Sequence, residues 1–233
     1  MTRTLALATV ASTAIFAASS AQAQEWEYSA NVYLFMPETD IGLGDQNVTL
    51  SFSDALDNLD FAFMGAFQGT NGTWGFIFDY MGIDLGGSAD GPGPISLDVN
   101  AKTETFTGFG TYRLYETATT QTELMAGLRY FRIKQSVSGG LIDVSFDEDW
   151  VDPVIGFRTF YKFNEDWSST FVADVGGWED RFTYQVLATA NYQINDSWTV
   201  NFGLRYFDIK NDGEAVDFDY EQFGPIVGVN YKF

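Results

Sequence analysis

The sequence predicts an all-β fold in which an antiparallel up-and-down barrel of about ten strands crosses a membrane. Three observations support this prediction. Apolar and polar residues alternate with a period of two from Trp26 to Phe233, tight turns alternate with long connections, and large aromatic residues gather near the tight turns. Because a chain of 233 residues suits one such domain, we expect a single folded unit.

The first 23 residues are expected to be a cleaved secretory signal. Arg3 supplies a positive charge, residues 5–18 are apolar or small, and Ala21-Gln22-Ala23 has the A-x-A pattern of a cleavage site. An apolar run of about 14 residues is too short for a bilayer-spanning helix. We therefore expect cleavage after Ala23 and a barrel domain over residues 24–233.

The alternation divides the rest of the chain into ten expected strands. Their ranges are 26–37, 60–70, 74–87, 99–115, 120–137, 150–164, 167–177, 181–195, 197–210 and 217–233. In the last range Phe223, Val227 and Val229 share one face, whereas Gly224 and Gly228 share the other. Residues 47–53 and 141–147 also alternate, so twelve strands are an alternative, and eight would result if shorter segments merged.

The connections between these strands fall into two length classes. Short turn signals rich in Asn, Asp, Gly or Thr lie at 71–72, 116–120, 164–166 and 195–196. Longer acidic or glycine-rich connections lie at 86–94, 138–150, 176–180 and 211–220. Short turns at one end and long loops at the other are typical of membrane-spanning up-and-down barrels. With an even number of strands, both termini lie at the short-turn end.

The composition excludes several classes of function. The chain has 12 basic and 32 acidic residues, a formal net charge of -20, no Cys and no His. Such a charge repels nucleic acid phosphates, so nucleic acid is not an expected partner. Without His and Cys there are no disulfides, thiol nucleophiles or imidazole bases. We expect neither an enzyme nor a cofactor, because the carboxylates around 147–152 fit a solvated loop better than a glycosidase pair.

The acidic loops are the one place where divalent cations would bind. Oxygen ligands for Ca²⁺ or Mg²⁺ are available at 147–152 and at 208–221. Neither segment has the spacing of a calcium hand, so we assign no metal site and expect weak divalent binding at most.

Five charged residues are expected to meet inside the barrel as a lumen ionic cluster. They lie about six to nine residues from the nearest tight turn, on the face opposite the apolar one. These residues are Asp79, Arg129, Arg158, Asp174 and Arg205. Their pairing would satisfy charges in a narrow lumen, and we regard an ionic core as more fitting than a conducting path.

The connection from Glu38 to Asp60 is unusually long. Ser53 is expected to cap a short turn over 54–59. Loops of this length are commonly functional or folded on themselves. Two alternatives remain: the segment restricts the barrel mouth, or it is a surface hairpin that extends the first two strands.

The aromatic residues favour a membrane barrel over a soluble lipocalin-like one. In water, so many large side chains at the rim would promote association, whereas a membrane barrel places them at the lipid interface. The set comprises Trp26, Tyr28, Trp74, Tyr112, Tyr115, Tyr161, Trp167, Tyr192, Trp198, Tyr231 and Phe233.

The end of the chain carries a resemblance to a known class. Residues 228–233 follow the pattern G-x-x-aromatic-x-aromatic through Gly228, Tyr231 and Phe233, with Ile226 standing where that class prefers a polar residue. The pattern is similar to the assembly signal of bacterial outer-membrane barrels, and the mature chain resembles the small OmpA-type or OmpW-type barrels. The resemblance implies the Gram-negative outer membrane, with its lipid, lipopolysaccharide and barrel assembly machinery as partners.

We expect the function to be structural, or that of a passive pore for small solutes or cations with a narrow charged lumen. A surface binding module, acting as an adhesin or receptor through acidic loops, is the alternative. A soluble periplasmic lipocalin-like carrier is a third.

Overall fold

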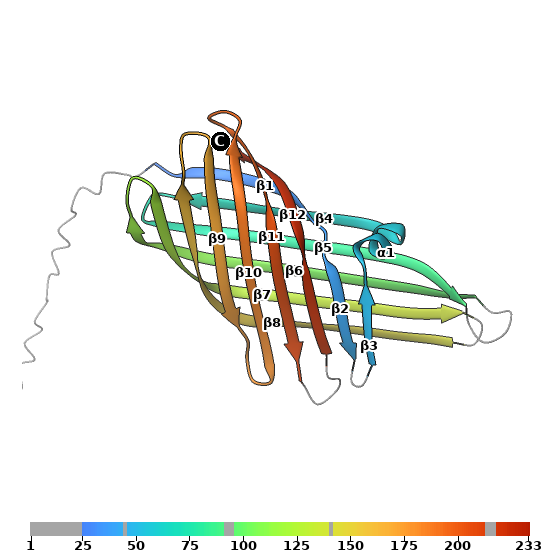
Figure 1. The fold of residues 1–233 in the computed structure, drawn as a ribbon. Coiled ribbons are helices and arrows are strands. Elements are labelled where there is room, and N and C mark those ends of the chain that lie inside the picture. Colours follow the sequence, from blue (N-terminus) through green and yellow to red (C-terminus); the bar gives the residue numbers. More distant parts are fainter. Residues whose placement is uncertain (1–24, 44–45, 91–95, 140–141, 213–217) are drawn as a thin grey trace, which may run out of the picture.

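The computed structural model describes residues 25–43, 46–90, 96–139, 142–212 and 218–233, which form one closed antiparallel β-barrel (Figure 1). The expected signal segment and its cleavage site after Ala23 lie outside the described residues. Among the residues described, no helix is long and apolar enough to cross a membrane. The predicted all-β barrel is confirmed.

Ten strands make the barrel wall. They are β1 (Glu27–Phe35), β4 (Leu59–Thr70), β5 (Trp74–Asp90), β6 (Ser96–Glu116), β7 (Thr120–Gly139), β8 (Ile142–Lys162), β9 (Trp167–Gly176), β10 (Arg181–Gln193), β11 (Trp198–Asn211) and β12 (Phe218–Lys232). Each pairs antiparallel with the next in this series, and β12 returns to β1 through seven residue pairs. Closure satisfies the backbone groups that an open sheet would expose.

Two short strands, β2 (Glu38–Leu43) and β3 (Gln46–Leu50), extend the wall without adding a crossing. After Met36 and Pro37, β2 continues the line of β1 along β12, and β3 then pairs with β2. Gly224 permits this junction, because a Cβ there would collide with the carbonyl oxygen of Met36. The alternating segment 47–53 therefore contributes to a hairpin strand, and 142–147 begins β8, so the wall has ten strands and not twelve.

Four tight turns lie at one end of the barrel, here called the tight-turn end; the opposite end is the loop end. In the first turn Asn71 Oδ1 accepts the backbone N–H groups of Thr73 and Trp74 at 3.1 and 2.8 Å, and Gly72 has φ of 89°. The same Asn-to-Trp pattern recurs at Asn164 with Trp167 and at Asn195 with Trp198. The asparagine side chain replaces a backbone turn and sets each tryptophan at the strand start.

The aromatic residues of the tight-turn end form pairs between neighbouring strands. Tryptophan and tyrosine rings lie 4.7 to 5.0 Å apart in the pairs Trp74–Tyr112, Trp167–Tyr192 and Trp198–Tyr231. Trp74 is 60% exposed, and the side chains of this belt face outward. A belt of this kind matches the interfacial girdle of membrane barrels.

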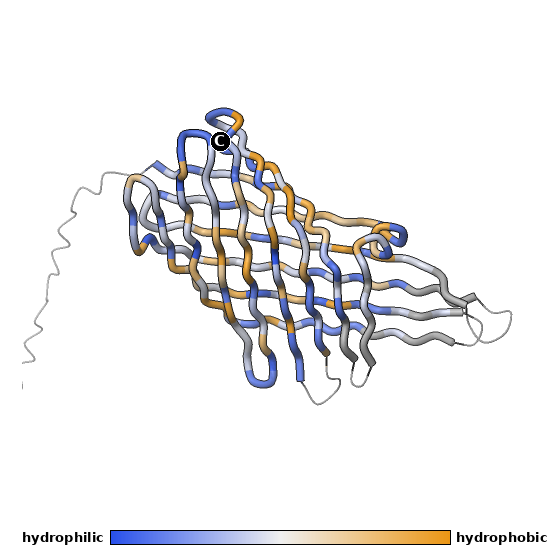
Figure 2. Tube along the Cα trace, in the orientation of Figure 1, coloured by the Kyte–Doolittle hydropathy of each residue, from blue (hydrophilic) through white to orange (hydrophobic). Residues whose placement is uncertain are grey.

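The strands differ in how far they reach at the loop end. Strands β5 to β8 extend well beyond the ends of β9 and β10, and Figure 1 shows them projecting to one side. Figure 2 shows hydrophobic and hydrophilic residues mixed along most strands, as expected where the two faces of a strand meet different surroundings. The long connections of the predicted scheme are therefore partly replaced by ordered strand extensions.

The segment between β2 and β4 contains the short helix α1 (Phe52–Asp57). The predicted cap at Ser53 is wrong: Ser51 is the N-cap, because its hydroxyl accepts the N–H of Asp54 while the Asp54 carboxylate accepts the N–H of Ser51. No residue of α1 is buried, so the helix does not enter the lumen. Among the described residues the segment extends the wall as a hairpin, the second of the two alternatives, rather than plugging the mouth.

Candidate functional site in the barrel lumen

The tight-turn half of the lumen holds a cavity of about 470 Å³. The buried apolar residues Phe109, Met125 and Val172 form part of its wall. Amide and hydroxyl side chains line much of the rest, among them Ser29, Asn31, Gln68, Ser168, Thr170, Thr189, Asn191, Gln193, Thr199 and Asn201. Several bond to one another: Asn191 Nδ2 donates to Thr170 Oγ1 at 2.9 Å, and Asn201 Nδ2 donates to Asn31 Oδ1 at 3.2 Å. This polar space suits water and small polar solutes.

A layer of buried charges bounds the cavity near the middle of β7. Arg129 is 1% exposed, and its Nη2 lies 2.7 Å from Asp174 Oδ1. Its Nη1 donates to Thr183 Oγ1 at 2.8 Å, and its Nε donates to Thr107 Oγ1 at 3.1 Å. The partners come from strands β6, β9 and β10, so this one guanidinium links the wall across the lumen. A buried charge paired and hydrogen-bonded in this way avoids the cost of an isolated one.

A second pair completes the layer. Arg205 Nη2 lies 3.5 Å from Asp79 Oδ1, and Arg205 Nη1 donates to the Tyr33 hydroxyl at 3.1 Å. The same hydroxyl donates to Asp79 Oδ2 at 2.8 Å. Three strands, β1, β5 and β11, are thus joined through one triangle of polar atoms. The structure therefore brings four of the five predicted cluster residues into one layer.

Phe207 connects this layer to an apolar core in the loop-end half. It is fully buried, and its ring lies 4.9 Å from Cζ of Arg129 and 5.3 Å from Cζ of Arg205. Beyond it, buried apolar side chains pack across the lumen: Tyr33, Phe35, Met64, Met81, Phe131, Ile133, Trp150, Ile209, Phe218, Tyr220 and Ile226. The charged layer and this core together fill the section of the lumen beyond the cavity.

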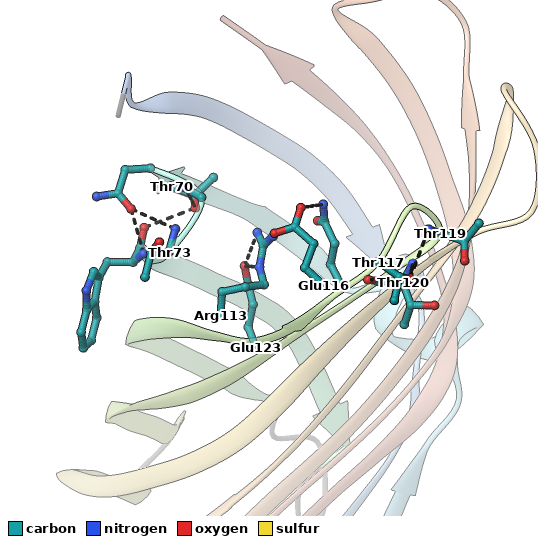
Figure 3. Close-up of polar contacts among 12 residues, drawn as sticks. Thr70, Thr73, Arg113, Glu116, Thr117, Thr119, Thr120 and Glu123 are labelled. Atoms are coloured by element: carbon teal, nitrogen blue, oxygen red, sulfur yellow. Dashed lines mark hydrogen bonds and ion pairs between the residues drawn. The ribbon is translucent and has the colours of Figure 1, made fainter. Parts of the chain in front are cut away.

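Arg158, the fifth predicted residue, does not pair with the other four. Its Nη2 lies 2.6 Å from Oε2 of Glu123, its direct cross-strand neighbour, and its Nη1 bonds to Gln68. Arg113 holds the other oxygen of Glu123 at 3.0 Å and also contacts Glu116 (Figure 3). The reason is register: Asp174 lies opposite Gly156, so Arg158 is two residues nearer the tight-turn end than the layer.

Sequence reasoning missed several of these partners. Glu123 and Tyr33 lie on inward faces, but the predicted cluster rested on distance from the turns and not on pairing. Asp152 and Arg181 form another pair, 2.9 Å apart, with the carboxylate almost fully buried. The inward alternation of β8 beyond Pro153 could have signalled Asp152, because it is the cross-strand neighbour of Arg129.

The acidic loops and the chain end were also singled out by sequence. Within the described residues, no group of three or more His, Cys, Asp or Glu is placed to hold a metal ion. At the chain end Gly228 pairs with Tyr33, Tyr231 pairs with Ala30, and the Phe233 N–H donates to the Tyr28 carbonyl at 3.0 Å. Gly228 and Tyr231 of the expected assembly signal thus lie in the strand that closes the barrel, and Phe233 follows that strand directly.

The comparisons with known proteins identify the architecture. Neither a scan of family models nor a search of curated proteins finds a match. Among solved structures, the outer membrane protease OmpT from Escherichia coli superposes with a TM-score of 0.58 at 13% identity, covering 90% of this chain and 97% of OmpT. The translocator domain of autotransporter NalP from Neisseria meningitidis gives 0.49 at 13% identity, covering 89% of this chain and 88% of that domain. At 13% identity the likeness to OmpT concerns the fold alone, and the fold is that of an outer-membrane β-barrel.

Proposed function

We propose that this chain is an integral protein of a Gram-negative outer membrane, and that its barrel is a structural unit closed to solutes in its resting state. The tight-turn end would face the periplasm, as short turns do in such barrels. The apolar outer surface and the Trp–Tyr pairs support the membrane location. OmpT is a protease, but the likeness to it is one of fold, and we assign no catalytic role to this chain.

The observation that carries the closed state is the double barrier across the lumen. The Arg129–Asp174 and Arg205–Asp79 pairs span the barrel, and Phe207 and its apolar neighbours fill the section beyond them. An ion crossing this section would shed its water against apolar side chains. A barrel of ten strands is near the size at which side chains fill the interior.

A cation path is the second candidate function. Asp79 favours it, because its side chain is 20% exposed while its partner Arg205 is only 4% exposed. A carboxylate at the edge of a water-filled cavity attracts cations. Conduction would then require the apolar core to rearrange.

Partners are proposed from chemistry and position. The assembly machinery would read the end of the chain, where Gly228 and Tyr231 lie in the closing strand β12 and Phe233 follows it directly. Lipid and lipopolysaccharide would surround the outward apolar face. We propose no adhesin role for the acidic loops.

Single-channel conductance of the refolded full-length chain in planar bilayers tests the closed state. The unmodified barrel should stay silent, whereas Phe207→Gly combined with Arg205→Ser should produce discrete current steps, because both barriers are thinned. The matched control, Phe202→Gly with Lys210→Ser on the same strand, changes outward or rim positions and should stay silent. Regular cation-selective steps from the unmodified protein would overturn the closed state and favour the cation path.

A further inference from the structure

The cavity in the tight-turn half of the lumen is open at one end and closed at the other. At its outer end Glu27 and Lys232 line it, and their side chains are 60% and 48% exposed. At its inner end it meets Asp79 and Arg205 of the charged layer. Its volume of about 470 Å³ lies within the range of about 300–1,000 Å³ that is usual for small-molecule pockets. The cavity can therefore admit a small ligand from the tight-turn end.

One side of the cavity carries amide and hydroxyl side chains, here called the amide arc. It comprises Asn31, Asn191, Gln193, Thr199, Asn201 and Asn230, which all line the cavity. Part of the arc is a cross-strand row from Gln193 on β10 to Asn31 on β1, in which each residue lies directly opposite the next. The side chains of Gln193, Thr199 and Asn230 form no hydrogen bond with another described residue. Their polar groups are therefore available to a ligand.

The opposite side of the cavity carries an apolar patch. Phe109 on β6, Met125 on β7 and Val172 on β9 are buried there and pack together. In the closed order of the wall strands, β6 and β7 lie across the lumen from β11 and β12, the central strands of the amide arc. The cavity therefore presents hydrogen-bonding groups on one side and an apolar surface on the other.

The charged side chains that line the cavity are paired with one another. Lys232 Nζ lies 2.8 Å from Glu27 Oε2 at the outer end. Further in, the Glu123 carboxylate holds both Arg113 and Arg158, and the charged layer pairs its own carboxylate and guanidinium. A charged ligand would have to displace one of these pairs and leave its partner uncompensated, whereas a neutral ligand would not. The wall therefore favours a neutral polar ligand.

We propose that this cavity binds a small neutral saccharide. A sugar ring carries hydroxyl groups around its edge and C–H groups on its faces. Each hydroxyl both donates and accepts hydrogen bonds, and a side-chain amide offers a donor and an acceptor side by side, so the edge of the ring fits the amide arc. A face of the ring fits the patch of Phe109, Met125 and Val172. The charged layer closes the inner end, so binding goes beyond the structural role proposed above and requires no conduction.

Saturation-transfer NMR tests the ligand class on the refolded full-length chain in an amine oxide detergent, which has no sugar headgroup. Irradiation of the protein should saturate the ring protons of glucose and maltose. Glucuronate and glucosamine have the same ring with a negative or a positive charge, and at slightly acidic pH both should give much weaker signals. Equal or stronger signals from either charged sugar would overturn the assignment to neutral saccharides. The absence of any signal from glucose and maltose would mean that the cavity takes up water only, and would overturn the site.

Variants of β11 and β10 locate the bound sugar. Thr199→Trp fills the cavity and should abolish the sugar signals, whereas Val200→Trp places the same ring on the outward face of β11 and should leave them unchanged. Gln193→Met combined with Thr199→Val keeps the side-chain volumes similar and removes polar groups that bond to no other described residue, so the barrel should fold normally. This double variant should weaken sugar binding about tenfold, because two hydrogen bonds to the ligand are lost. Sugar binding that is unchanged in the double variant, or signals that survive in refolded Thr199→Trp, would overturn the site.

Discussion

The two halves of the lumen are built from the same strands but differ in content. Towards the tight turns, Asn31, Asn191 and Asn201 surround a cavity of about 470 Å³. Towards the loop end, Phe131 and Phe207 pack with other apolar side chains until almost no exposed surface remains. One wall with one alternation thus encloses both a polar space and an apolar core, so the inward residues and not the strand geometry decide which part of a small barrel is hollow.

The charged layer lies where these two environments meet. Its carboxylates and guanidinium groups can keep contact with polar neighbours on one side and with the Phe207 ring on the other. Substitutions of a charged residue in the layer, of the Phe207 ring and of a charged residue at the cavity should therefore lower the free energy of unfolding by different amounts.

The largest effect is expected from Asp174→Leu, which leaves Arg129 buried without its carboxylate. Breaking a buried pair by removing one partner costs about 3–5 kcal/mol of folding free energy. Adding Arg129→Met should recover at least half of that loss, because an apolar pair of similar volume replaces the charges. Urea unfolding of the refolded barrel in detergent measures both variants. A double variant as unstable as the single one would mean that shape, and not charge balance, holds the layer.

A somewhat smaller loss is expected from Phe207→Ala on the packed side of the comparison. Deleting a fully buried ring leaves a cavity and costs about 3 kcal/mol. Phe202→Ala on the same strand is the control, because Phe202 is 45% exposed on the outward face and its loss opens no internal cavity. The same urea experiment compares the two, and equal losses would contradict the packed core.

Glu123→Gln tests the hollow side, with an expected loss of about 1–2 kcal/mol. The carboxylate accepts bonds from Arg113 and Arg158, but Arg158 is 22% exposed and retains access to water in the cavity. Glu116→Gln, which removes the outer partner of Arg113, should cost less than half as much, since that carboxylate is 54% exposed. A loss from Glu123→Gln as large as that from Asp174→Leu would show that the cavity is not wet.

The sequence allowed the barrel, its strand number and most of the ionic layer to be predicted, because alternation assigns each residue to a face. The partner of Arg158 could not be predicted from its distance to the turn. Arg158 lies two residues away from the position opposite Asp174, and it therefore pairs with Glu123 instead. Tyr33 was missed because most tyrosines of this chain were assigned to the outward aromatic belt, and residue type alone does not distinguish an inward tyrosine from an outward one. The end of the ladder between β1 and β4 at Val32 could not be predicted either, because it follows from the path of β2 along β12.

The smallest effect is expected from Asp147→Asn on the loop-end extension of β8, beyond the outward apolar residue Val151. Arg132 hydrogen-bonds the carboxylate at 3.1 Å and, with Lys134, lowers the pKa of Asp147. Because the pKa of Asp147 is lowered in the folded state, the ion pair adds to the free energy of unfolding at pH values above the ordinary carboxyl pKa. This contribution is lost only as the pH falls through the lower pKa of the folded state. Because the side chains of Arg132 and Asp147 are 32% and 46% exposed, solvent screens the pair. The urea midpoint at neutral pH should therefore not change measurably, and the unmodified protein and Asp147→Asn should converge further at acid pH. A clear loss at neutral pH would show that the extension, and not only the lumen, stabilises the barrel.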